Sequence, residues 1–133
     1  VLGSRGLGDV YKRQLGILPK TVDVMAAKLG AKRESLVAAI GPSIGPCCFE
    51  TDADVPEAME RQMGAAVRPF IAARGVKFHV DLQGINTMLL KNAGLAAENI
   101  LNSGLCTYCH SDEFWSHRVT HGRRGVQAGV ICL

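Results

Sequence analysis

Residues 77–94 read KFHVDLQGINTMLLKNAG, and the hydrophobic period changes within this stretch. Apolar and polar residues alternate over residues 77–82, which is the period of a half-buried strand. The apolar residues that follow share one face of a helix: Leu82, Ile85 and Leu89. Asp81 is expected to cap this helix, and Gly94 is a typical residue for its end. The stretch therefore predicts a strand that leads directly into a helix.

Helix and strand signals alternate on both sides of this stretch. A first helix is predicted from Leu18 to Leu29, with Gly30 as its end, and a second over residues 54–64, with Asp54 as its N-cap. The remaining predictions are a strand over 36–41, a turn and strand over 96–106, an irregular polar segment over 111–125 and a closing strand over 126–133. This order leaves α+β and α/β both open.

The composition indicates one soluble domain. A chain of 133 residues with 47% hydrophobic residues can bury one core and is short for two. Its net charge of +3 and the lack of any block of like charges argue against nucleic acid or an anionic membrane as a partner. No apolar run approaches the roughly 18 residues of a membrane span. Five cysteines, two of them adjacent, do not resemble a secreted disulfide framework, so we expect a cytoplasmic protein.

The first residues do not resemble the rest of the chain. The sequence begins with Val1, and residues 1–14 have no hydrophobic period and resemble a translated sequencing-adapter or cloning junction. We therefore expect residues 1–14 to be non-native and residues 15–133 to be the C-terminal part of a single domain.

The cysteines allow three kinds of chemistry. CTYCH at residues 106–110 has the spacing of covalent haem attachment, although nothing else in the sequence indicates haem. Cys106 and Cys109 could also form a redox dithiol, or join Cys47 and Cys48 in a zinc site. Adjacent cysteine side chains are expected to diverge, which argues against one ion bound by both Cys47 and Cys48. Simple packing of the thiols remains the alternative.

Two loops are candidates for ligand binding. GPSIGP at residues 41–46 predicts a stiff loop at the end of a strand, where backbone can approach a ligand closely. SHRVTHGRRG at residues 116–125 carries donors suited to a phosphate or another anion, although a solvated loop would have the same composition. Phe114 and Trp115 could stack on a base or pack in a core. For His79 we expect no more than solvation or a local hydrogen bond.

Four stretches in this order resemble one family. They are AAIGPSIGPCCFE, VDLQGINTMLLKNAGLAAENI, GLCTYC, and DEFWSHR followed by a basic turn and GVICL. Together they are similar to the C-terminal half of the YfiH-like laccase-domain proteins, called polyphenol oxidases or purine nucleoside phosphorylases. The resemblance extends from about Leu15 to Leu133 and implies an α+β fold of mixed sheets flanked by helices.

The resemblance also implies a function. The family cleaves adenosine, inosine and methylthioadenosine with phosphate, shows some adenosine deamination, and has one zinc-type site. The ligands of that site precede the helix that begins near Leu15. The resemblance therefore assigns no metal ligand and no catalytic residue to this chain, and we expect the chain by itself to be inactive. Near the end, Arg124-Gly125-Val126 stands where many members have Thr-Gly-Arg.

The substrate side of the site is expected here. The predicted residues that bind purine nucleoside and phosphate are Ser43, Gly45, Ser116, His117 and Arg118. Two alternative functions remain. One is a copper-dependent polyphenol oxidase, which would need more histidines than the four present. The other is a non-enzymatic cysteine-zinc module. The sequence does not determine the oligomeric state.

Overall fold

The computed structural model describes residues 16–130. The predicted junction segment, residues 1–14, lies outside the described residues, as do residue 15 and residues 131–133. The helices are α2 (Ile17–Leu29), α3 (Asp54–Met63) and α4 (Leu82–Asn92), with short 3₁₀ helices η2 (Arg33–Ser35), η3 (Gly64–Phe70) and η4 (Ala97–Asn99). The strands are β1 (Ala38–Ile40), β2 (Glu50–Thr51), β3 (Ile71–Arg74), β4 (Lys77–Val80) and β5 (Ile100–Asn102).

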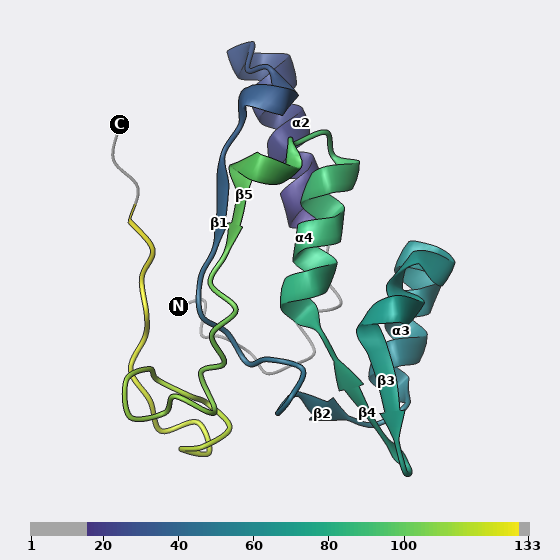
Figure 1. Ribbon diagram of the computed structural model, residues 1–133, viewed down its shortest axis with the longest axis vertical. Coiled ribbons are helices and arrows are strands. Elements are labelled where there is room, and N and C mark those ends of the chain that lie inside the picture. Colours follow the sequence, from purple (N-terminus) through teal and green to yellow (C-terminus); the bar gives the residue numbers. More distant parts are fainter. Residues whose placement is uncertain (1–15, 131–133) are drawn as a thin grey trace.

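The strands form one parallel and one antiparallel sheet. β1 pairs with β5 in parallel, with Ala38 opposite Ile100. β2, β4 and β3 form an antiparallel sheet in that order. Figure 1 shows α2 and α4 beside the parallel pair, with α3 and the antiparallel sheet at the other end of α4. Helices with both kinds of strand pairing confirm the predicted α+β class.

Helix α4 joins two hydrophobic cores. Its first turn packs into the larger core, which contains Phe49, Val55, Met59, Val67, Val80, Leu82 and Ile85. Its last turn packs into the smaller core, which contains Val22, Leu90 and Leu95. The larger core lies against α3 and the antiparallel sheet, and the smaller against α2 and the parallel pair. The position of α4 therefore fixes where the two sheets lie relative to each other.

The predicted strand-to-helix transition is confirmed. The side chain of Asp81 accepts a hydrogen bond from the backbone N–H of Gly84 at 2.9 Å, and the backbone N–H of Asp81 donates to the carbonyl of Phe70 at 2.8 Å. Asp81 thus starts α4 and ties it to the end of η3. The end of α2 also follows the prediction, because Gly30 adopts the left-handed φ of 66° that favours glycine.

Two local predictions were wrong. The N-cap of α3 is Ala53, without a side-chain cap, and Asp54 is the first helical residue, where its charge still favours the helix N-terminus. Of the two environments expected for His79, solvent exposure is excluded, because the residue is only 9% exposed in the central strand of the antiparallel sheet. Residues 126–130 form no strand, because no neighbouring strand pairs with them among the described residues. The rest of the predicted closing strand, residues 131–133, lies outside the described part.

The described helices are too short or too polar to cross a bilayer. This holds for residues 16–130, the part of the chain in which such a helix could be sought.

Gly84 provides a test of the α4 junction. A Cβ at this position would lie 2.5 Å from Asp81 Oδ2 and 2.7 Å from the Phe70 ring. Helix propensity alone predicts that Gly84→Ala stabilises by about 1 kcal/mol. We expect the steric overlap to reverse the sign and to lower the free energy of unfolding by about 1–3 kcal/mol, measured by urea denaturation. Gly41→Ala is the control, because a Cβ added at Gly41 would meet nothing within 4 Å. A stabilised Gly84→Ala variant would contradict the described packing.

Candidate functional site: two paired loops and a four-cysteine cluster

The segments that follow β1 and β5 run side by side. The parallel pairing continues beyond the strands through a bridge between Ser43 and Cys106. The N–H of Ser43 donates to the carbonyl of Leu105 at 3.3 Å, and the N–H of Thr107 donates to the carbonyl of Ser43 at 3.0 Å. The predicted GPSIGP loop and the CTYC segment are therefore joined through their backbones.

Gln83 holds both loops from the side of α4. Its side-chain Nε2 donates to Ser43 Oγ and to the carbonyl of Leu105, each at 3.0 Å. The residue is only 5% exposed, so these bonds form in a desolvated setting. Sequence reasoning missed Gln83. One feature of the sequence could have indicated it: Gln83 is a polar residue between Leu82 and Ile85, close to the apolar face of the helix, where a buried side chain would need hydrogen-bond partners.

His79 holds the end of the loop that follows β1, which is called the first loop below. Its Nδ1 lies 2.6 Å from the carbonyl oxygen of Pro46, and its Nε2 lies 3.6 Å from a carboxylate oxygen of Glu50. The prediction of a local hydrogen bond is confirmed. The bond connects the buried strand β4 to the residue just before the cysteine pair.

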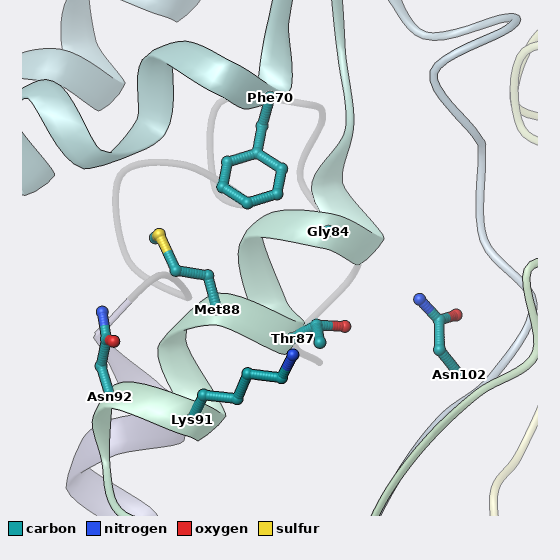
Figure 2. Close-up of a pocket in the computed structure, with 7 residues that line it drawn as sticks. All are labelled: Phe70, Gly84, Thr87, Met88, Lys91, Asn92 and Asn102. Carbon is teal, nitrogen blue, oxygen red and sulfur yellow. The ribbon is translucent and has the colours of Figure 1, made fainter. Parts of the chain in front are cut away.

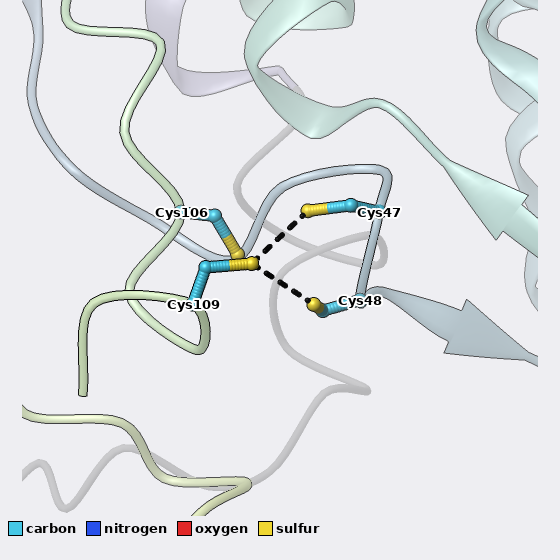
Figure 3. Close-up of side chains that lie close together, drawn as sticks. All are labelled: Cys47, Cys48, Cys106 and Cys109. Atoms are coloured by element: carbon cyan, nitrogen blue, oxygen red, sulfur yellow. Dashed lines mark hydrogen bonds between the residues drawn. The ribbon is translucent and has the colours of Figure 1, made fainter.

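Four cysteines converge where the two loops meet (Figure 3). The sulfur of Cys109 lies 3.6 Å from that of Cys47 and 3.5 Å from that of Cys48. With Cys106, all four sulfur atoms lie within 4.8 Å of one another. The expectation that Cys47 and Cys48 diverge was wrong, because the chain turns tightly here: the N–H groups of Cys48 and Phe49 both donate to the carbonyl of Gly45.

The position of Gly45 leaves little room for a side chain. A Cβ there would lie 3.2 Å from Cys106 Cβ and 3.4 Å from Cys47 Sγ. The N–H of Gly45 also donates to Cys106 Sγ at 3.2 Å. Glycine therefore permits the close approach of the two loops and supplies a donor to one of the sulfurs.

The thiols of Cys47, Cys48 and Cys106 do not ionise alike. Burial and hydrogen bonding to Cys109 raise the pKa of the Cys47 and Cys48 thiols. Burial also opposes ionisation of Cys106, but hydrogen bonds from backbone N–H groups outweigh it and lower the pKa of Cys106 to about 6. Those donors belong to Gly45, Cys109 and Tyr108. The protein thus favours negative charge at one sulfur and disfavours it at two neighbouring sulfurs.

Arg118 attaches the basic segment to the first loop. Its Nη1 donates to the carbonyls of Cys48, at 3.2 Å, and Glu50, at 2.9 Å. The guanidinium carbon also lies 5.4 Å from the centroid of the Phe49 ring, within the range of a cation–π contact. The segment from Ser116 onward therefore packs against the turn that carries the cysteine pair.

Ser116 and His117 have different environments. Ser116 is 4% exposed, and its carbonyl accepts bonds from the N–H and the hydroxyl of Thr120. His117 is exposed, and its carbonyl accepts a bond from the N–H of Gly122 at 2.9 Å. Of the five predicted substrate-binding residues, Ser43 and Gly45 lie in the first loop, and Arg118 connects that loop to the segment that carries the other two.

A separate open groove of 440 Å³ lies along α4 (Figure 2). It is lined by Phe70, Gly84, Thr87, Met88, Lys91, Asn92 and Asn102. It shares none of the five predicted residues and none of the four cysteines, so it does not define the candidate site.

The described residues offer one set of potential metal ligands. Within residues 16–130, the four cysteines are the group of three or more side chains placed close enough to bind one ion. Four thiolates suit a soft ion in a tetrahedral site. They do not suit a histidine-based copper centre.

The fold and the site define a class of protein: an α+β domain in which parallel-strand loops carry a possible metal site beside a basic segment. Residues 3–133 match the family model described as multi-copper polyphenol oxidoreductase laccase. The chain belongs to this family.

Two curated relatives and one solved structure agree with this assignment. The chain is 38% identical over 133 residues to the purine nucleoside phosphorylase of Xylella fastidiosa (strain Temecula1), covering 98% of this chain and 47% of that protein. It is 33% identical over 123 residues to human purine nucleoside phosphorylase LACC1, covering 90% of this chain and 28% of that protein. The crystal structure of Bacillus licheniformis hypothetical protein YfiH matches with a TM-score of 0.78 and 29% identity, covering 85% of this chain and 43% of that one. The chain thus spans less than half of each.

Gln83 provides a test of how the two loops are held. Gln83→Leu keeps the side-chain size but leaves Ser43 Oγ and the carbonyl of Leu105 without this donor. We expect the free energy of unfolding to fall by about 1–3 kcal/mol, measured by chemical denaturation. Gln62→Leu, at an exposed position of α3, is the control and should change stability by no more than about 0.5 kcal/mol. Equal effects of the two substitutions would contradict the described role of Gln83.

Proposed function

We propose that this chain forms the phosphate-facing part of an enzyme that cleaves purine nucleosides by phosphorolysis. The relatives' names support the reaction, and the chain matches them over most of its own length. The observation that carries the proposal is the contact of Arg118 with the loop after β1, because it brings a cationic segment to a stiff glycine-containing loop.

Phosphorolysis of a nucleoside depends mainly on positioning and on charge stabilisation. Phosphate must be held by cationic and amide donors and directed at the anomeric carbon of the ribose. Both protein bonds of Arg118 use Nη1. A guanidinium has five N–H donors, so Nη2 and Nε can still bind a phosphate oxygen. In this proposal the exposed His117 adds a further donor, and Ser43, Gly45 and Ser116 form the wall of the pocket.

We assign no residue of this chain as a ligand of the zinc ion expected for the family. A zinc ion would supply a Lewis acid or activate a bound water, which would account for adenosine deamination as a side activity. The resemblance implies that the ligands for that role precede the helix that begins near Leu15, so we assign no catalytic step to the four cysteines. We further propose adenosine, inosine and methylthioadenosine as substrates, and a chain that is inactive by itself.

A chimera tests the proposed function. Residues 15–133 replace the matching part of the Xylella fastidiosa purine nucleoside phosphorylase, and phosphate-dependent release of hypoxanthine from inosine is measured. We expect the chimera to be active and the 133-residue chain alone to be inactive. A folded chimera that neither binds nor cleaves inosine would contradict the proposed function. Activity of the isolated 133-residue chain would contradict the expectation that this chain is inactive by itself.

Arg118→Ala in the active chimera tests the phosphate-binding role. We expect the KM for phosphate to rise by at least about tenfold, because a charge-assisted hydrogen bond contributes about 1.5–3 kcal/mol. Arg74→Ala removes the same charge from an exposed position on β3 and should leave the KM unchanged. The melting temperature of both variants controls for the two structural bonds of Arg118. An unchanged phosphate KM in a folded Arg118→Ala variant would exclude the role.

Copper-dependent oxidation of phenols is a second candidate, supported by the description of the matching family. It predicts oxygen uptake by the chimera when a phenol and copper are supplied. Because the described residues group no histidines into a candidate copper site, we expect no uptake above that of free copper. Uptake that depends on the folded protein would favour this candidate over phosphorolysis.

A further inference from the structure

We propose that Cys47, Cys48, Cys106 and Cys109 form a structural zinc site that fastens the loop after β1 to the loop after β5. The argument for this site does not use the proposed nucleoside chemistry, although Gly45 and Arg118 contact the cysteine cluster as well as the proposed pocket. It adds a second function to the loops: they are cross-linked by an ion as well as by their backbones.

The distances fit a tetrahedral ion. With Zn–S bonds of about 2.3 Å, the sulfurs of a regular tetrahedron lie about 3.8 Å apart. The sulfur of Cys109 lies 3.6 Å and 3.5 Å from those of Cys47 and Cys48, and no pair of the four is separated by more than 4.8 Å. A small contraction or expansion of these distances would complete the coordination.

The backbone around Cys106 is arranged to support a thiolate. The N–H of Gly45 donates to its sulfur at 3.2 Å. Such donors outside the ligand set orient a metal-bound sulfur and stabilise its charge. This donor belongs to the loop after β1, whereas Cys106 belongs to the loop after β5, so the bond also joins the two loops.

The guanidinium of Arg118 lies against the proposed site, which is expected to carry a negative charge. Four thiolates around Zn²⁺ carry a net charge of −2. Arg118 donates to the carbonyl of Cys48, one of the four cysteines. A positive charge is therefore held at the backbone of the cluster and offsets part of that excess.

Access and ligand number favour a structural ion. Cys47 and Cys109 are exposed and Cys106 is buried, so an ion can enter from solvent and become bound at the base of the cluster. Four protein ligands leave no open position for water, as in structural zinc sites. The ligands of the two loops are separated by about 60 residues in the chain. An ion that bridges them closes a long loop, which restricts the unfolded chain.

Metal content and cysteine substitutions test the site. The untagged 133-residue protein, purified under reducing conditions with zinc, should contain about one zinc ion per chain by mass spectrometry. Cys109→Ser should lower zinc affinity by more than about 100-fold, a larger loss than an outer partner causes. Cys132→Ser removes a thiol while leaving all four proposed ligands and should keep full zinc content. Cobalt in place of zinc should give the visible absorption of tetrahedral coordination by four thiolates in the control, and a weaker sulfur-to-cobalt band in Cys109→Ser, which keeps three thiolates.

A measurement on the unmodified protein covers the case in which Cys109→Ser does not fold. Alkylation followed by peptide mass spectrometry should show Cys47 and Cys109 protected with zinc and at least about tenfold more reactive after chelation. Wild-type protein without bound zinc would overturn the proposal. So would equal alkylation with and without zinc, an unchanged zinc affinity in a folded Cys109→Ser variant, or a disulfide from Cys109 to Cys47 or Cys48 under reducing conditions.

Discussion

The backbone pairing of Ser43 with Cys106 is the interaction on which the candidate site depends. The two residues belong to segments far apart in the chain, and each follows a strand of the parallel pair. Parallel strands end at the same edge of a sheet, so their following loops begin side by side. The additional bonds at Ser43 continue this alignment for a few residues. Together with the bonds of Gln83 and of the Gly45 N–H, they hold the two cysteine-bearing loops against each other.

Several side chains have roles that follow from this alignment. Gln83 holds the paired loops from α4, His79 holds the first loop from β4, and Arg118 brings the basic segment against it. Gly45 lets the loops approach each other without a side chain between them. The candidate site is therefore supported from three directions. Its supports are buried or partly buried, while His117 and the sulfurs of Cys47 and Cys109 remain accessible.

Much of the fold could be predicted from local sequence. The change of period near Asp81 and the glycine at position 30 are short-range signals, and both mark element boundaries correctly. β2 and β3 escaped prediction because they are short and their apolar residues do not alternate clearly. Residues 126–130 show the opposite error: apolar composition predicted a strand, but a strand also needs a neighbour with which to pair.

The site was less predictable because it depends on long-range geometry. The sequence shows that Cys47 and Cys48 are adjacent, but only the turn at Gly45 shows that both sulfurs face Cys109. Gln83 and the bonds of Arg118 likewise depend on where α4 and the basic segment lie. The family resemblance, in contrast, rested on several separate stretches and was confirmed by the match over residues 3–133.

Hydrogen exchange of individual amides, followed by nuclear magnetic resonance, tests the alignment of the two loops most directly. The N–H groups of Ser43 and Thr107 form the bonds between the loops. We expect both to exchange as slowly as the N–H of Val80, which donates to the carbonyl of Phe49 in the core. Exchange of Ser43 and Thr107 at the rate of an unstructured peptide, with Val80 still protected, would contradict the pairing of the loops.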